Sequence, residues 1–210
     1  MFTDTISLFD TYYVKLDKSQ VPGFNKNLGR EVRERFQQLS FLVNGVRTRQ
    51  AEDLELNNRW LALCRGRSID FSTLDRTKLP PDLAEIAKIV ERSEGLVFEM
   101  KLFTESFYYL AGRLRTLLRH KSRPLPGLET FECRGVRDVR NKLLEHAEGT
   151  DSQISIRSWG FSRESGPVLK AVRYDHQQHV FPDSGLFTNA NEIKVNLDTL
   201  LRAQLNELQP

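Results

Sequence analysis

Three residues in the second half of the chain have side chains suited to acid–base chemistry on a phosphate ester. Arg140 and Asn141 are adjacent, and five residues separate Arg140 from His146. Histidine has an ordinary pKa of about 6.5 and can exchange a proton near neutral pH. Arginine presents a planar fork of donors to phosphate oxygens, and asparagine can hydrogen-bond phosphate or ribose. These residue types suit metal-free cleavage of RNA, and they would also bind phosphate without turnover.

Helical spacing places Arg140 and His146 beside an apolar seam. The segment 128–146 is predicted to be a helix that follows the break at 124–127 and ends before Gly149. At about 100° per residue, Arg140 and His146 lie on opposite sides of a seam that must pack on another helix. The seam consists of Val136, Val139 and Leu143. The two polar residues would then border the cleft at this seam, about 9 Å apart along the helix axis.

The stretch from Arg137 to His146, RDVRNKLLEH, resembles the signature of the HEPN superfamily. That signature is an arginine, a polar residue directly after it, and a histidine a few positions on, near the end of a bundle helix. The resemblance implies a helical bundle in which Arg140, Asn141 and His146 cleave RNA without a metal or cofactor. It also implies a toxin or a phage-defence effector, and a homodimer formed through the Val136, Val139 and Leu143 helix.

A different function remains open within the same resemblance. HEPN-like proteins also occur as non-catalytic modules that dimerise, bind RNA or nucleotides, or partner a nucleotidyltransferase. The resemblance thus implies RNA as the ligand and an antitoxin or a nucleotidyltransferase as the protein partner. A purely structural helical protein is the third alternative, in which Arg140 and Asn141 are surface residues and His146 complements the helix dipole.

Positive charge is concentrated around the motif. The segment 113–146 carries nine cations and four anions, a net +5, whereas the whole chain carries +3. Such clustering favours contact with phosphates, although a solvated helical face explains it equally well. The residues assigned to RNA contact are Arg134, Arg137, Lys142 and His120.

Apolar periodicity predicts a mainly α fold, an antiparallel helical bundle. Residues 28–46 and 51–64 have the spacing of two amphipathic helices, separated by a polar stretch. A long helix is predicted from Asp82 to Arg119, with a bend near Gly95, because proline and aspartate at 80–82 favour a helix start. Leucines between 197 and 208 predict a C-terminal helix.

We expect one domain covering residues 1–210. Its region 151–190 is predicted to hold a small β-hairpin followed by a loop over 175–191, before the C-terminal helix.

Several other sites are disfavoured by the sequence. Cys64 and Cys133 have no metal-ligand spacing and are expected to be reduced, inert thiols. His176 and His179 form an isolated His-x-x-His, which is usually solvated, so no metal site is assigned. No signal peptide or membrane span is expected, which predicts a cytoplasmic protein.

Overall fold

The computed structural model describes residues 1–19, 26–65, 81–120, 125–132, 154–162, 166–173 and 186–208. Its helices are α1 (Thr3–Lys18), α2 (Lys26–Cys64), α3 (Pro81–Leu118) and α5 (Ala190–Glu207). The strands are β1 (Ile154–Ser162), β2 (Gly166–Arg173) and β3 (Leu186–Asn189). The chain is therefore mainly α, which confirms the prediction of a mainly helical fold.

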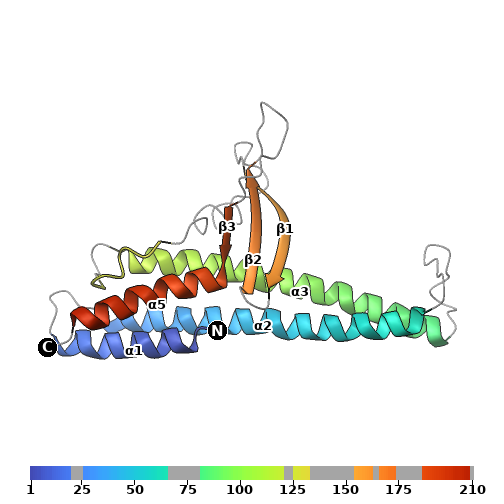
Figure 1. The fold of residues 1–210 in the computed structure, drawn as a ribbon, viewed down its shortest axis with the longest axis horizontal. Coiled ribbons are helices and arrows are strands. Elements are labelled where there is room, and N and C mark those ends of the chain that lie inside the picture. The colour runs from blue at the N-terminus through green and yellow to red at the C-terminus, as the bar shows by residue number, and fades with distance from the viewer. Residues whose placement is uncertain are drawn as a thin grey trace.

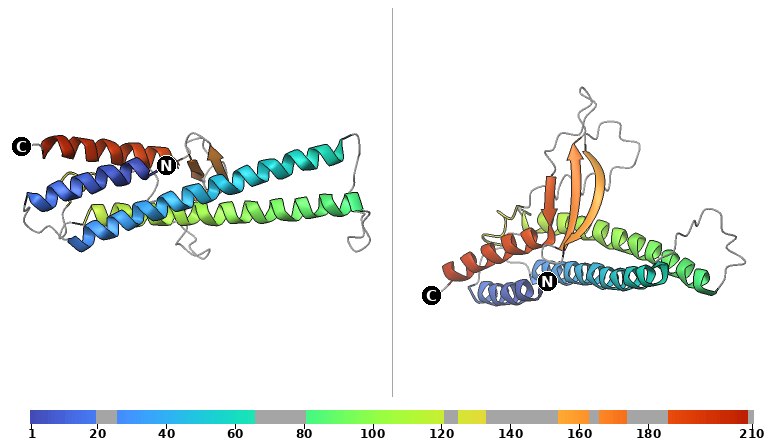
Figure 2. Two further views of the ribbon diagram at one scale, coloured as in Figure 1. Left: turned by 90° about the horizontal axis from the view of Figure 1, so that it is seen from below. Right: turned by 45° about the vertical axis from the view of Figure 1, so that its right-hand side comes forward.

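The four helices form a bundle along only half of the length of α2 and α3. α2 runs opposite to α1, α3 and α5, and α1 and α5 lie beside its first half (Figure 1). The second half of α2 and the first half of α3 extend together beyond α1 and α5 (Figure 2). We call this extension the distal hairpin, residues 47–64 and 81–103.

Aromatic side chains fill the core of the four-helix part. Phe9 of α1 packs edge-on against Phe36 of α2, with ring centroids 5.3 Å apart. Phe2, just before α1, packs against Phe107 of α3 at 6.4 Å. All four rings are at most 1% exposed. Burying side chains of this size stabilises the fold by about 1.5–3 kcal/mol each, before the entropy of ordering them is subtracted.

α1 was not predicted from the sequence. Its buried residues are spaced four, three and four apart, as on one face of a helix, and they are Thr5, Phe9, Tyr12 and Leu16. The fully buried Thr5 donates a hydrogen bond of 2.6 Å to Asp198 of α5, and Asp198 also pairs with Lys194. A buried hydroxyl is tolerated here because its partner lies on the neighbouring helix.

The prediction of two separate helices before residue 65 is wrong, because α2 is continuous from Lys26 to Cys64. The polar residues 47–50 that suggested a gap contain neither glycine nor proline. Arg49 among them lies against α3, where its guanidinium is 5.1 Å from the centroid of the Phe103 ring. A polar stretch therefore continues the helix because its charged side chain has a partner on the next helix.

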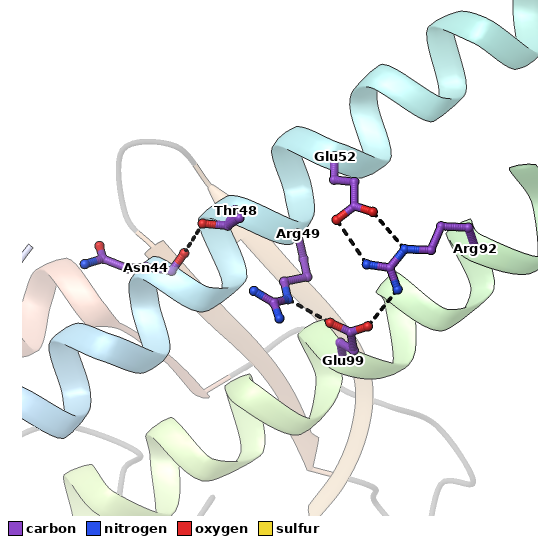
Figure 3. Close-up of polar contacts among 6 residues, drawn as sticks. All are labelled: Asn44, Thr48, Arg49, Glu52, Arg92 and Glu99. Atoms are coloured by element: carbon purple, nitrogen blue, oxygen red, sulfur yellow. Dashed lines mark hydrogen bonds and ion pairs between the residues drawn. The ribbon is translucent and has the colours of Figure 1, made fainter.

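Ion pairs connect the two helices of the distal hairpin. Arg92 of α3 donates to both carboxylate oxygens of Glu52 on α2, at 2.7 and 3.1 Å, and to Glu99 at 2.8 Å. Glu99 also accepts a 2.7 Å bond from Arg49 of α2 (Figure 3). The hydrogen bond from Arg92 lowers the pKa of Glu52, and the bonds from Arg49 and then Arg92 lower the pKa of Glu99. The last buried residue of α2 is Val46. Beyond it, these four charged side chains link α2 to α3.

Three strands form an antiparallel sheet in the order β1-β2-β3. β1 and β2 lie within the segment for which a hairpin is expected, and the sheet projects away from the helices (Figure 1). The loop predicted over residues 175–191 is wrong at its end, where β3 occupies Leu186–Asn189 and α5 begins at Ala190. α5 begins earlier than its leucines suggest because Ala190 and Ile193 are also buried in the core.

The ion pairs predict a pH-dependent contribution to stability. Since the folded-state pKa of Glu52 and of Glu99 is lowered from 4.5, their contribution is present above about pH 4.5 and is lost as the pH falls through the lowered values. We expect Arg92→Gln to lower the Tm by about 2–4 °C at pH 7 and by less at pH 3, measured by circular dichroism. Lys88→Gln, an exposed cation on the same helix, is the control. An equal loss at both pH values would contradict the assignment.

Candidate RNA-binding site

Most of the predicted site residues lie outside the described part of the chain. These are Arg134, Arg137, Arg140, Asn141, Lys142 and His146, together with the seam of Val136, Val139 and Leu143. Their roles stay predictions. The structure does describe the segment that leads into the motif, residues 125–132, and the helix ends around it.

The predicted helix start at Leu128 is wrong, because residues 126–130 form turns and 131–132 are not helical. The N–H of Leu128 donates to the Leu125 carbonyl at 2.9 Å, and that of Phe131 donates to the Leu128 carbonyl at 3.0 Å. Pro126 has no N–H to donate, and Gly127 has a φ of +76°, which no right-handed helix contains. Successive turns bring Leu125, Leu128 and Phe131 to the same side, and all three are at most 1% exposed.

Contacts with two helices hold the 125–132 segment in place. The hydroxyl of Tyr12 on α1 donates a 3.0 Å hydrogen bond to the carbonyl of Pro126. Burial raises the pKa of Tyr12, and the nearby carboxylate of Glu129 raises it further, so the phenol remains a donor at any physiological pH. The Cα of Gly127 lies so close to Gln204 of α5 that a Cβ would come within 2.0 Å of its side chain. The segment is thus fixed to the bundle by buried side chains and by its backbone.

An ion-pair cluster fixes the last described residue before the motif. Arg115 near the end of α3 donates to both carboxylate oxygens of Glu132, at 2.8 and 2.9 Å, and Arg119 pairs with the same carboxylate. The amide of Asn196 on α5 donates to the Glu132 carbonyl at 3.3 Å. Two guanidinium groups share one carboxylate, which leaves a net positive charge at this end of α3.

This cluster changes the electrostatic interpretation of the basic segment. Arg115 and Arg119 were counted among its nine cations, and the structure shows that both are engaged by Glu132. Arg115 is also only 21% exposed, so its main contact is structural. Phosphate contact is therefore left to the other seven cations of the segment, four of which follow Glu132. The sequence could not reveal that Glu132 binds two arginines, because Arg119 and Arg115 lie 13 and 17 residues away at the C-terminal end of α3.

Among the residues assigned to RNA contact, His120 is the one that the structure describes. It is exposed and lies two residues beyond the end of α3, where its N–H donates to the Leu117 carbonyl at 3.3 Å. A histidine at a helix C-terminus interacts favourably with the partial negative charge there. The position of His120 suits either this interaction with the helix dipole or a contact with phosphate beside Arg119.

Comparison with known proteins finds no relative for this chain: no protein-family model, curated protein or solved structure matches it. Within the described ranges, no three His, Cys, Asp or Glu residues are grouped so that they could hold a metal ion. The pair His176 and His179 lies outside those ranges. Among the described helices, none is long and apolar enough to cross a membrane.

The backbone of Gly127 gives a test of the anchored segment. We expect Gly127→Ala to destabilise the fold by about 1–2 kcal/mol, because a side chain at positive φ is strained and Gln204 must move. Gly95→Ala, in the middle of α3 with only one side-chain atom within 4 Å, at 3.9 Å, should instead stabilise it by about 0.5–1 kcal/mol. Urea unfolding of both variants measures the difference. Equal effects of the two substitutions would show that the turn at Gly127 does not constrain the fold.

Proposed function

We propose that this protein is a metal-independent endoribonuclease of the HEPN type, with Arg140, Asn141 and His146 as its catalytic residues. The observation that carries the proposal is the Arg140-Asn141-x4-His146 pattern within a basic segment of a mainly helical chain. The residue types match the chemistry, and the pattern resembles the superfamily signature. The toxin or phage-defence role, with an antitoxin or nucleotidyltransferase partner, is part of the same proposal.

The described segment before the motif supports this function. Arg140 follows Glu132 by eight residues, and Glu132 is held by two arginines of α3 and by Asn196 of α5. A site that stabilises a transition state needs its groups held in place by a rigid scaffold. The anchored segment provides a fixed starting point for the motif at one end of the bundle.

The proposed reaction is attack by the ribose 2′-oxygen on the adjacent phosphorus. A base takes the proton of the 2′-hydroxyl, the P–O bond to the 5′-oxygen breaks, and an acid returns a proton to that oxygen. The products are a 2′,3′-cyclic phosphate and a 5′-hydroxyl end. Arg140 stabilises the charge on the phosphorane, Asn141 orients the phosphate or ribose, and His146 transfers the proton. Two chains paired through Val136, Val139 and Leu143 would bring two histidines together, one for each proton transfer.

Removal of the proposed proton-transfer group is the direct test. We expect wild-type protein to cut a pool of labelled RNAs in excess EDTA, and His146→Ala to cut them about 100-fold to 10,000-fold more slowly. His179→Ala is the matched control, because it removes a histidine outside the motif. The product ends, identified by mass spectrometry, should carry the cyclic phosphate.

Two results would overturn the catalytic assignment. Unchanged cleavage by His146→Ala would exclude that residue from the reaction. Absence of cleavage by the wild type, combined with RNA binding, would favour the non-catalytic binding module instead.

Salt dependence tests the RNA contacts separately from catalysis. Each cation that neutralises a phosphate releases counterions, so log Kd should depend linearly on log salt concentration. We expect Arg137→Ala to weaken binding of a single-stranded RNA and to reduce that slope by about 0.7. Arg115→Ala should change the slope less, because Arg115 is engaged by Glu132. Fluorescence anisotropy at several salt concentrations measures both slopes, and equal slopes for wild type and Arg137→Ala would rule out that contact.

A further inference from the structure

The buried apolar side chains of α2 and α3 belong to two separate groups. The main core cluster includes Val43 of α2 and Phe107 of α3, packed together with residues of α1 and α5. Among the described residues, four other apolar side chains are at most 5% exposed and lie outside this cluster: Val46, Ile86, Ile89 and Leu96. They lie in or next to the distal hairpin, which extends beyond α1 and α5 (Figure 2). The distal hairpin therefore has a small apolar core of its own.

The boundary between the two groups lies where Phe103 of α3 packs on Gly45 of α2. A Cβ at Gly45 would lie 3.2 Å from the Phe103 ring, so the two helices are in close contact there. Phe103 packs against the main core cluster, and its ring lies 6.3 Å from that of Phe41. One turn further along α2, the guanidinium of Arg49 lies 5.1 Å from the centroid of the Phe103 ring. Beyond this boundary, charged side chains supply much of the contact between α2 and α3.

The polar contacts that cross the distal hairpin are exposed to water. Arg59 of α2 pairs with Glu85 of α3 at 2.6 Å, and their side chains are 57% and 44% exposed. The hydroxyl of Ser93 donates a 2.5 Å hydrogen bond to Asp53. Arg92 adds the pairs with the two carboxylates shown in Figure 3. An exposed ion pair changes an equilibrium by only a small factor, so α2 and α3 separate more readily here than in the four-helix part.

We propose that the distal hairpin opens and closes as a unit of its own while the four-helix part of the chain stays folded. Opening breaks the ion pairs and separates Ile86, Ile89 and Leu96 from α2, and it leaves the main core cluster intact. Most of the stability of a helix in a protein comes from the packing of one face, so residues 47–64 lose helical hydrogen bonds when they leave α3. The open state exposes an apolar surface that the closed state buries. The proposal does not depend on RNA cleavage.

Hydrogen exchange of the full chain at pH 7, followed by mass spectrometry, tests the proposal. We call the backbone N–H groups of residues 47–64 and 85–96 the distal amides, and those of residues 32–46 and 104–118 the core amides. After correction for the intrinsic rate of each amide, we expect the distal amides to exchange at least about tenfold faster than the core amides. The reason is that opening the distal hairpin breaks fewer contacts than unfolding the whole chain.

A variant of the distal hairpin tests whether the ion pairs hold it closed. Arg92→Gln removes the pairs with Glu52 and Glu99 and should raise the exchange rate of the distal amides about twofold to tenfold. Lys88→Gln, which removes an exposed cation from the same helix, is the matched control and should leave that rate unchanged. No response of the distal amides to Arg92→Gln would overturn the role of the ion pairs in the closed state.

A variant of the four-helix part separates local opening from unfolding of the whole chain. Thr5→Val removes the hydrogen bond to Asp198 and should raise the exchange rate of the core amides about threefold to tenfold. The distal amides should keep their wild-type rate, because this hydrogen bond remains intact while the distal hairpin is open. Gly127→Ala is a second variant from which the same pattern is expected. Distal amides that exchange no faster than the core amides, or that accelerate with them in these variants, would show that the chain unfolds as one unit and would overturn the proposal.

Discussion

Burial of the apolar faces of α1, α2, α3 and α5 against one another is the constraint on which the other features of this protein depend. Phe9, Phe36 and Phe107 are almost fully buried in that contact, although they come from three different helices. The same core also buries Leu128 and Phe131, which fixes the segment before the motif. Core packing and the position of the proposed site are therefore parts of one arrangement.

Beyond the four-helix part, a different balance of forces holds α2 and α3 together. α2 buries no residue after Val46, and Ile86, Ile89 and Leu96 are the buried residues of α3 in this half. Two helices without neighbours cannot enclose a wide core, so charged pairs such as Arg92 with Glu52 supply part of the contact. Exposed ion pairs of this kind contribute little individually, so the distal hairpin gains its stability from several small contributions.

Polar groups have distinct tasks at the two ends of α3. At its C-terminal end, Glu132 binds Arg115 and Arg119 and joins the 125–132 segment to the bundle. In its N-terminal half, Arg92 pairs with Glu52 of α2 and with Glu99, and so joins α3 to α2.

The sequence by itself determined the helical class and the long α3, because periodic apolar residues and the prolines at 80–81 act locally. It also provided the Arg140, Asn141 and His146 pattern, which no described contact tests. It missed α1 and the continuity of α2, whose polar residue Arg49 is satisfied by α3. Tertiary structure alone decided that Glu132 pairs with Arg115. This pairing depends on a partner distant in sequence, since side-chain spacing indicates which face of a helix a residue occupies but not what lies opposite it.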